Sequence, residues 1–325
     1  MRFATIGTSS IVQLFGEAVE KVDGTTWTVA HSRDPQRARE FAQQHGARPV
    51  SSMDELAASP DVDAVYIASP NSQHHAQASA LLRAGKHVLV EKSACATAAE
   101  WTDLCELADQ RGLVLVESVR SVFDPTWRTI ASCRDSLEPV RQVNLQMCQR
   151  SRRYDNFLAG TIENIFRPEL AAGALMDLGV YCLHPLVTLF GAPETVQASS
   201  VMLRNGIDGA TTLLLGYPGF TATVTCSKIS ANPAPSVIAG EDSTLVIDAI
   251  ADPRALRVLH AHGCDPEDLE VDKPLPQQAY VLQAFEAMVA DPSLALPHRT
   301  ATATALTVMD AARRQIRLRF PANAA

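Results

Sequence analysis

The sequence predicts an α/β fold, with an N-terminal doubly wound parallel sheet and a C-terminal α+β domain that carries a mainly antiparallel open sheet. Short apolar runs alternate with helical apolar spacing through the first third of the chain, which is typical of βαβ units. Beyond residue 118, apolar and polar side chains alternate singly, as in a half-buried antiparallel sheet. A length of 325 residues also exceeds what one core usually supports, which favours two domains.

In the first third, each apolar run ends at a turn residue and a helical stripe of apolar residues follows. Expected strands cover residues 3–6, 27–30, 62–68, 87–90 and 113–116, and expected helices cover residues 11–22, 35–42, 53–57, 76–82 and 98–109. Because crossovers between parallel strands are right-handed, these elements predict one doubly wound domain over residues 1–118.

The second predicted domain covers residues 119–325. Its expected strands are residues 143–147, 196–203, 211–217, 220–227 and 244–247, and its expected helices are residues 175–189, 277–289 and 300–316. We expect the last helix to pack back on either domain.

Composition excludes several classes of protein. A net charge of −8 argues against a general binder of nucleic acid or anionic membranes. The seven cysteines form no Cys-x-x-Cys pair, and no His-Glu-x-x-His appears, so no metal site, redox pair or disulfide scaffold is expected. No signal peptide and no membrane-spanning run of about 20 apolar residues is expected. We therefore expect a cytoplasmic protein.

The loop after the first strand is a candidate phosphate-binding loop. It contains Gly7, Thr8, Ser9, Ser10 and Ile11, between a strand and a helix. A dinucleotide pyrophosphate meets a helix N-terminus at this place in a Rossmann domain. Only the first glycine of Gly-x-Gly-x-x-Gly is present, since Ser9 and Val12 occupy the other two places. A plain strand–helix turn is the alternative.

The end of the second strand bears on the choice of dinucleotide. An NAD site expects an acid there that binds the ribose hydroxyls. Here Ser32 and Arg33 offer a hydroxyl and a guanidinium, which suit a 2′-phosphate, and Arg37 lies one helical turn further on. We interpret this as a preference for NADP. Asp34 keeps NAD open, and Arg33 as a solvated surface charge is the structural alternative.

Three stretches carry a resemblance to a known family. Residues 69–74 read SPNSQH, residues 84–92 read AGKHVLVEK, and residues 172–184 read AGALMDLGVYCLH. In order and spacing they resemble the glucose–fructose oxidoreductase and inositol dehydrogenase (Gfo/Idh/MocA) family of NAD(P)-dependent enzymes. The tyrosine in the third stretch is similar to the dimeric dihydrodiol and D-xylose dehydrogenase branch.

The resemblance implies cofactor contacts from two turns. Ser69 and Pro70 shape the first turn, Asn71 contacts the nicotinamide end, and His74 is either functional or structural. Glu91 contacts the cofactor ribose or positions Lys92.

Ser93 stands where the family has a proline, normally in cis. Because a cis bond before another residue costs about 2.5–4 kcal/mol, we expect a trans Lys92–Ser93 bond.

The implied chemistry needs a base for the alcohol proton. Lys92 and Tyr181 supply it, because a neighbouring ammonium stabilises a phenolate. Asp177, Tyr181 and His184 share one helical face at i, i+4 and i+7. Asp177 binds a substrate hydroxyl or holds Lys92, unless it is only a capping acid. His184 is a substrate contact or a structural histidine. Pro185 predicts a kink or an early helix end.

Arg167 is a further candidate substrate contact. It lies in a polar and aromatic stretch with Arg153, Phe157 and Phe166, for which loop and surface explanations are equally good.

These residues predict an NADP-dependent oxidoreductase acting on a secondary alcohol or carbonyl of a sugar, polyol or related cyclic alcohol. The alternatives are a non-catalytic NAD(P)-binding sensor and a redox-assisted glycosidase of the same family. The resemblance also implies a homodimer or homotetramer, paired through the C-terminal sheet, where residues 221–227 present threonines.

Overall fold

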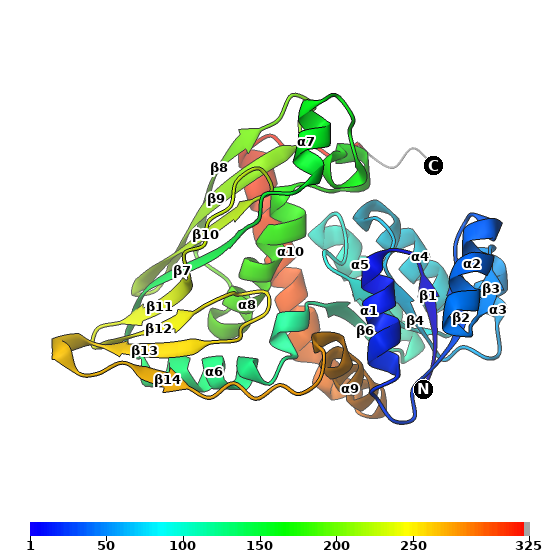
Figure 1. Cartoon of the computed structure of the whole chain (residues 1–325), viewed down its shortest axis with the longest axis horizontal. Coiled ribbons are helices and arrows are strands. Elements are labelled where there is room, and N and C mark those ends of the chain that lie inside the picture. The colour runs from blue at the N-terminus through cyan, green and yellow to red at the C-terminus, as the bar shows by residue number, and fades with distance from the viewer. Residues whose placement is uncertain (322–325) are drawn as a thin grey trace. The chain divides into compact units, whose positions relative to one another are not determined.

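The structure is a computed structural model that describes residues 1–321, and it divides into two compact units (Figure 1). The first unit contains Met1–Ser118 and Leu275–Ala303, and the second contains Val119–Pro274 and the chain from Thr304 onward. Residues 275–303 thus belong to the same unit as residues 1–118. The boundary at residue 118 as a limit between folding domains stays a prediction.

The first unit is built on a six-stranded parallel sheet, in the order β3-β2-β1-β4-β5-β6. Its strands are β1 (Arg2–Ile6), β2 (Thr26–His31), β3 (Arg48–Val50), β4 (Ala64–Ile67), β5 (His87–Glu91) and β6 (Leu115–Ser118). This confirms the doubly wound sheet. Only β3 was not expected, because it has three residues, includes Pro49 and is mostly exposed.

Local signals set the helices of this unit, which are α1 (Ser10–Val19), α2 (Pro35–His45), α3 (Met53–Ala58), α4 (Asn71–Arg83), α5 (Ala98–Arg111) and α9 (Gln277–Ala290). The side chains of Asp34, Ser52 and Thr97 cap the first turns of α2, α3 and α5. Gly46 and Gly112 end α2 and α5 in the left-handed conformation.

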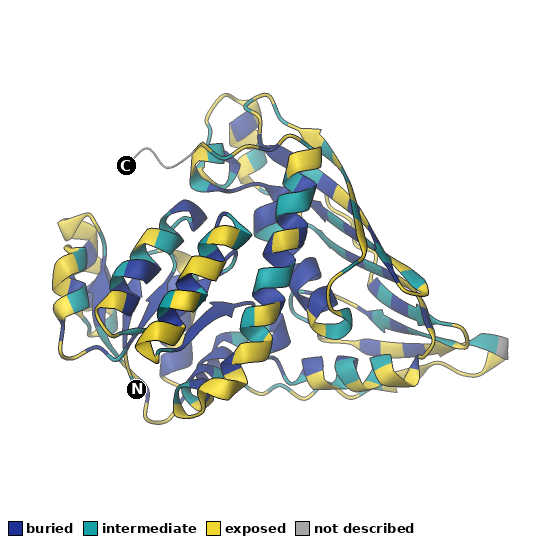
Figure 2. Cartoon of the chain, turned by 180° about the vertical axis from the view of Figure 1, so that it is seen from behind, coloured by how far each residue is buried: buried dark blue, intermediate teal, exposed yellow. Residues whose placement is uncertain are grey.

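Large apolar side chains fill the core of the first unit. Phe3, Phe15, Tyr66 and Trp101 are fully buried, and the rings of Phe15 and Tyr66 stack with centroids 4.2 Å apart. All four residues of β4 are buried, as expected for a strand covered on both faces (Figure 2). The carboxyl ends of β1, β4 and β5 are therefore held by a rigid layer.

The second unit is built on an eight-stranded sheet, in the order β14-β13-β12-β11-β7-β10-β9-β8. Its strands are β7 (Val140–Cys148), β8 (Thr195–Met202), β9 (Asp208–Tyr217), β10 (Phe220–Ser227), β11 (Ser236–Gly240), β12 (Ser243–Ile247), β13 (Leu256–His260) and β14 (Glu267–Leu269). All neighbours pair antiparallel except β7 and β10, which are parallel. The mainly antiparallel sheet is confirmed.

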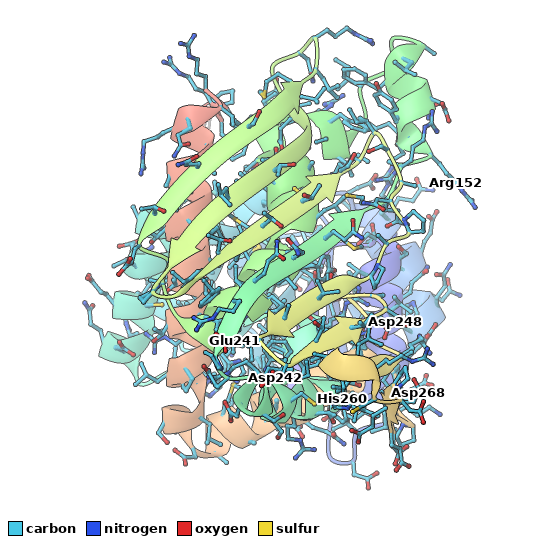
Figure 3. All side chains as sticks on the ribbon, turned by 90° about the vertical axis from the view of Figure 1, so that its left-hand side faces the viewer. Arg152, Glu241, Asp242, Asp248, His260 and Asp268 are labelled. Atoms are coloured by element: carbon cyan, nitrogen blue, oxygen red, sulfur yellow. The ribbon has the colours of Figure 1, made fainter. Side chains whose placement is uncertain are left out.

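The helices of the second unit are α6 (Thr126–Ser136), α7 (Arg153–Leu158) and α8 (Val180–Phe190), and α10 (Leu296–Gln315) passes from the first unit into the second. The sheet also has an exposed face, on which Val201 is 56% and Leu214 is 43% exposed. Glu241, Asp242, Asp248 and Asp268 lie around its β11–β14 end (Figure 3). Pairing of two chains through this sheet stays a prediction.

One stretch corrects an expectation. The helical stretch Pro168–Phe190 contains an 18-residue window with a mean hydropathy of 1.5, so it is long and apolar enough to cross a membrane. However, 83% of that window is buried inside the structure, which is typical of the core helix of a globular protein.

Candidate functional site

The loop after β1 requires its glycine. Gly7 has a φ of +114°, and a Cβ atom there would lie 2.7 Å from the carbonyl oxygen of Ala68. Its N–H donates to the His31 carbonyl at 3.1 Å. The glycine therefore lets the chain pass close to the carboxyl ends of the neighbouring strands β2 and β4.

The first turn of α1 follows this loop directly. Ser9 is its N-cap residue but makes no side-chain capping bond, and the turn contains no acidic residue. No protein carboxylate in the first turn thus neutralises the positive end of the helix. Thr8 is half-buried and Ser10 is exposed beside it. An anion such as a phosphate fits this arrangement.

The acid that follows β2, Asp34, is used as a helix cap. Asp34 Oδ1 accepts from the backbone N–H of Gln36 at 2.9 Å and of Arg37 at 3.3 Å, so its carboxylate caps α2. Ser32 is half-buried, and the side chains of Arg33 and Arg37 are exposed. The Ser32 hydroxyl accepts from the Asp34 N–H at 3.3 Å, and Arg37 Nε lies 3.8 Å from Asp34 Oδ2. A hydroxyl and two exposed guanidinium groups thus lie at this edge.

His74 joins the turns that follow β4 and β5. Its Nε2 lies 2.8 Å from the Ser69 carbonyl and its Nδ1 lies 3.0 Å from the Ser93 carbonyl. Burial lowers the pKa of this fully buried imidazole. The Ser69 hydroxyl donates to Gln77 Oε1 at 2.6 Å, which fixes the same turn. These contacts give His74 a clear structural role.

The peptide bond between Lys92 and Ser93 is cis. The expectation of a trans bond was wrong. Ser93 is fully buried, and its carbonyl is the one that His74 contacts.

Glu91 is buried and bonded from several directions. Its Oε1 accepts from the Tyr66 hydroxyl at 2.5 Å and from Gln278 Nε2 at 3.5 Å. Its Oε2 accepts from the backbone N–H of Lys92 at 3.3 Å. Gln278 belongs to α9, which the sequence did not connect with this place. The contacts are those of a residue that positions the backbone of Lys92.

A second buried acid lies on the next strand. Glu117 of β6 accepts from the Ala94 N–H at 2.7 Å and from the Thr302 hydroxyl at 2.9 Å. Burial raises the pKa of this carboxyl to about 7. Glu117 therefore anchors the segment that directly follows Lys92 and Ser93.

In the second unit, a π-turn over Leu175–Gly179 precedes α8 and carries Asp177. The buried ammonium of Lys228 pairs with Asp177 Oδ2 and also donates to the Ile165 carbonyl at 3.1 Å. Turns of this kind occur often at functional sites. Asp177 is therefore held by an ion pair directly before α8.

Tyr181 and His184 lie on α8, which runs through Pro185 to Phe190. Of the two expectations for Pro185, the early helix end is wrong, and the kink stays a prediction. Arg120 Nη2 donates to the Tyr181 phenol oxygen at 3.3 Å. His184 is buried, and its Nδ1 lies 3.4 Å from the Thr188 hydroxyl.

The start of this helical segment is fixed by a buried acid. Asp208 Oδ2 accepts from the Leu175 N–H at 2.6 Å and from the Thr211 hydroxyl at 2.9 Å. Burial raises the pKa of Asp208 to about 6. Gly173 has a φ of +113°, and a Cβ atom there would lie 2.0 Å from Asp208 Oδ1. The glycine leaves room for this acid.

The polar and aromatic stretch before the helix is mainly structural. Phe157 and Phe166 are buried in a hydrophobic cluster with Ile207 and Leu318. Arg153 pairs with Glu163 at the surface. The exposed Arg167 donates through Nε to the Ile162 carbonyl at 3.1 Å. A substrate contact by Arg167 stays a prediction.

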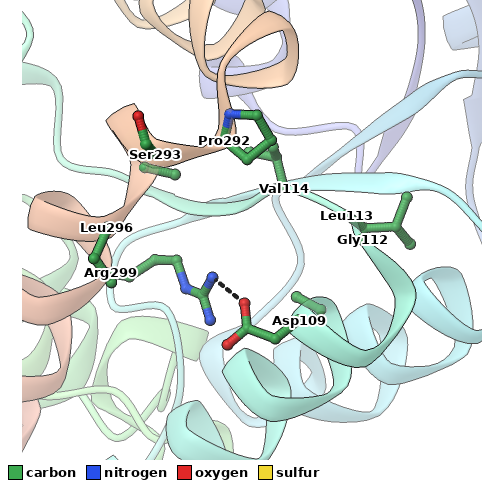
Figure 4. A pocket seen from close by; sticks show the side chains of 10 residues that line it. Asp109, Gly112, Leu113, Val114, Pro292, Ser293, Leu296 and Arg299 are labelled. Atoms are coloured by element: carbon green, nitrogen blue, oxygen red, sulfur yellow. Dashed lines mark hydrogen bonds and ion pairs between the residues drawn. The ribbon is translucent and has the colours of Figure 1, made fainter.

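A cavity of about 340 Å³ lies elsewhere in the first unit. It is bordered by Asp109, Val114, Ser293 and Arg299, and Arg299 pairs with Asp109 at 2.7 Å (Figure 4). Val114 precedes β6, so the cavity lies at the amino edge of the sheet. Dinucleotides bind at the carboxyl edge of such sheets, which separates this cavity from the candidate site.

Sequence reasoning missed several charged and polar contacts, made by Arg120, Lys228, Asp208, Glu117 and Gln278. A partial signal was present for two of them. Glu117 interrupts an apolar strand, and Lys228 directly follows the alternating strand β10. A charge at such a place is buried only when it is paired.

Comparison with known proteins agrees with this geometry. Residues 1–118 match the family model of an oxidoreductase family with an NAD-binding Rossmann fold, and residues 137–246 match the GFO/IDH/MocA C-terminal domain. The chain is 38% identical to the NADP(+)-dependent scyllo-inositol 2-dehydrogenase of Bacillus subtilis, over 100% of both chains. It is 34% identical to trans-1,2-dihydrobenzene-1,2-diol dehydrogenase of Sus scrofa, over 61% of this chain and 59% of that protein.

Among solved structures, a 3-ketoreductase from Actinomadura kijaniata has the same fold, with a TM-score of 0.86 and 24% identity over 97% of each chain. The matched ranges of the two family models and of the full-length relative include residues 69–74, 84–92 and 172–184. The chain therefore belongs to the Gfo/Idh/MocA family of oxidoreductases.

Proposed function

We propose that the protein is an NADP-dependent oxidoreductase that interconverts a secondary alcohol and a ketone on a sugar, polyol or related cyclic alcohol. The observation that carries this proposal is the match to an NADP(+)-dependent inositol dehydrogenase, at 38% identity over the whole of both chains. A polyol ring with secondary alcohols is the substrate class that follows from it.

The first unit fits the cofactor. The uncapped first turn of α1 suits a pyrophosphate, and Asp34 is already used as a helix cap. Ser32, Arg33 and Arg37 then favour a 2′-phosphate over a bare ribose. When bound, the nicotinamide accepts or supplies the hydride.

The turn after β4 contributes further proposed cofactor contacts. Because β4 and β2 flank β1 on opposite sides, Ser69, Pro70 and Asn71 follow a strand at the point where the strand order reverses. We propose that Asn71 contacts the nicotinamide end. Glu91 positions the backbone of Lys92 through the contact at 3.3 Å.

Side chains of the protein transfer the proton of the alcohol. We propose that Tyr181 takes the alcohol proton during oxidation and returns it during reduction, with the ammonium of Lys92 favouring the phenolate. Asp177, held in place by Lys228, binds a neighbouring substrate hydroxyl. His184 is a secondary candidate for a substrate contact because it shares the helix.

The test is a panel of inositols, sugars and polyols offered with NADP or NAD, followed at the absorbance of reduced nicotinamide. We expect reduction with NADP and at least one polyol. Tyr181→Phe should keep cofactor binding and lower turnover about a hundredfold or more, the usual contribution of an acid–base residue. Tyr217→Phe is the matched control, because that phenol bonds the Gly191 carbonyl at 3.1 Å within the second unit.

Two results would contradict the proposal. Tight NADP binding without reduction by any alcohol would indicate a non-catalytic sensor. Unchanged turnover in Tyr181→Phe would remove the phenol from the mechanism and leave the cofactor assignment intact.

A further inference from the structure

The phenol of Tyr181 has a cationic partner within its own unit. Arg120 begins a short 3-10 turn, Arg120–Val122, that packs against α8. Its Nη2 donates to the phenol oxygen at 3.3 Å, although the two residues are 61 positions apart in sequence. Tyr181 is only 6% exposed, so little water weakens the contact.

The chemistry of this pair is directional. A guanidinium has only donors and stays charged at every working pH. The phenol oxygen is therefore the acceptor, and the contact does not use the phenol hydrogen. A hydrogen bond from a cation to an ionised oxygen is about twice as strong as a neutral one. The contact thus favours phenolate over phenol.

We propose that Arg120 is a positioning residue for the acid–base step: it stabilises the phenolate of Tyr181 and orients the phenol hydrogen toward the substrate oxygen. The inference rests on the proposed function, because it assigns a partner to the same phenol. It adds a second cation to the one that Lys92 supplies, and it comes from the second unit.

The other ionisable groups around α8 leave this effect in place. Asp177 would oppose a phenolate, but the buried ammonium of Lys228 offsets its charge. Burial raises the pKa of the thiols of Cys148, Cys182 and Cys226, on β7, α8 and β10, and keeps them neutral. His184 is the remaining titratable group of the helix that carries the phenol.

The kinetic test compares pH profiles of kcat/KM for the full chain and three variants. In Arg120→Met, the pH at half-maximal oxidation should rise by about one unit or more, the usual effect of losing a nearby opposite charge. The alkaline limb of the reduction profile should move with it. Arg120→Lys should recover part of the shift, and Arg128→Met, at an exposed arginine of α6, should cause none.

A second measurement does not depend on turnover. The chain has five tyrosines, so the phenolate absorbance of the wild type minus that of Tyr181→Phe isolates the titration of Tyr181. The same difference in an Arg120→Met background should have its midpoint at higher pH. An unmoved midpoint, or a loss of activity that is equal at every pH, would overturn the role of Arg120. Unchanged turnover in Tyr181→Phe would instead overturn the proposed mechanism.

Discussion

The buried acids next to Lys92 and the groups around Tyr181 are held in different ways. In the first unit, neutral donors surround Glu91 and Glu117, and these donors are the hydroxyls of Tyr66 and Thr302 and backbone N–H groups. Such bonds hold a carboxyl whether or not it carries a proton, with the donor and acceptor roles adjusted. The raised pKa of Glu117, caused by burial, reflects this setting.

In the second unit, Asp208 is also held by neutral donors, but Asp177 and Tyr181 each have a cation as partner. Lys228 pairs with Asp177, and Arg120 donates to Tyr181. Removing one member of such a pair leaves a charge in a place that excludes water. The difference teaches that the neutral donors on Glu117 fix the backbone after Lys92 and tolerate a change of protonation, whereas the contacts of Asp177 and Tyr181 depend on keeping their cations.

The largest effect is expected when the ion pair between Lys228 and Asp177 is broken. Lys228→Met should lower the free energy of unfolding by about 3–5 kcal/mol, because Asp177 loses its buried ammonium partner. Turnover should fall with it, since Asp177 loses the contact that holds its carboxylate in place. Urea denaturation measures the first effect and the polyol assay the second.

The double variant Asp177→Asn with Lys228→Met is the control for this interpretation. Because both charges are absent, it should be more stable than Lys228→Met alone. If the two losses simply add, the pair is not coupled, and the contrast between the units fails.

A smaller effect concerns Glu117 and pH. Its carboxyl has a pKa of about 7 in the folded chain, against a usual value of 4.5. Below pH 4.5 both states hold the proton. Between these values only the folded state does, so stability falls as pH rises and levels off above pH 7. The whole effect is about 3 kcal/mol.

Glu117→Gln removes this titration and can keep both bonds, since an amide accepts from Ala94 and donates to Thr302. We expect its stability relative to the wild type to improve by about 2 kcal/mol from pH 5 to pH 8. The exposed Glu106→Gln on α5 is the control. A relative stability that does not change with pH would show that this carboxyl does not titrate between pH 5 and pH 8, and the contrast with the ion pair of Asp177 would fail.

The contrast also explains what the sequence could predict. The parallel sheet of residues 1–118 follows from local periodicity, and the loop at Gly7 follows from its place between a strand and a helix. The partners of the acids are not local. Gln278 and Thr302 reach Glu91 and Glu117 from 187 and 185 residues away, and such pairings leave no periodic pattern.

The contacts of the second unit were harder to predict from the sequence for the same reason. Asp177 and Tyr181 were identified through a motif, but Lys228 and Arg120 lie 51 and 61 residues from them. Periodicity assigned Phe157 and Phe166 no clear place, and only the packing with Ile207 and Leu318 shows that they are core residues. A single sequence specifies the faces of elements but not which charges meet across them.

The smallest effect is expected at the end of β2 in the first unit, where the charge of Arg33 is exposed. Arg33→Ala should weaken NADP binding about tenfold or more, or about 1.4 kcal/mol, because a charge-assisted bond to the 2′-phosphate is lost. NAD binding should change little, since Asp34 is occupied as a helix cap. Arg39→Ala, at an exposed arginine of α2, is the control in a binding titration of both dinucleotides. Equal losses for NADP and NAD would show that Arg33 does not distinguish them, and the first unit would then select its cofactor without a charge.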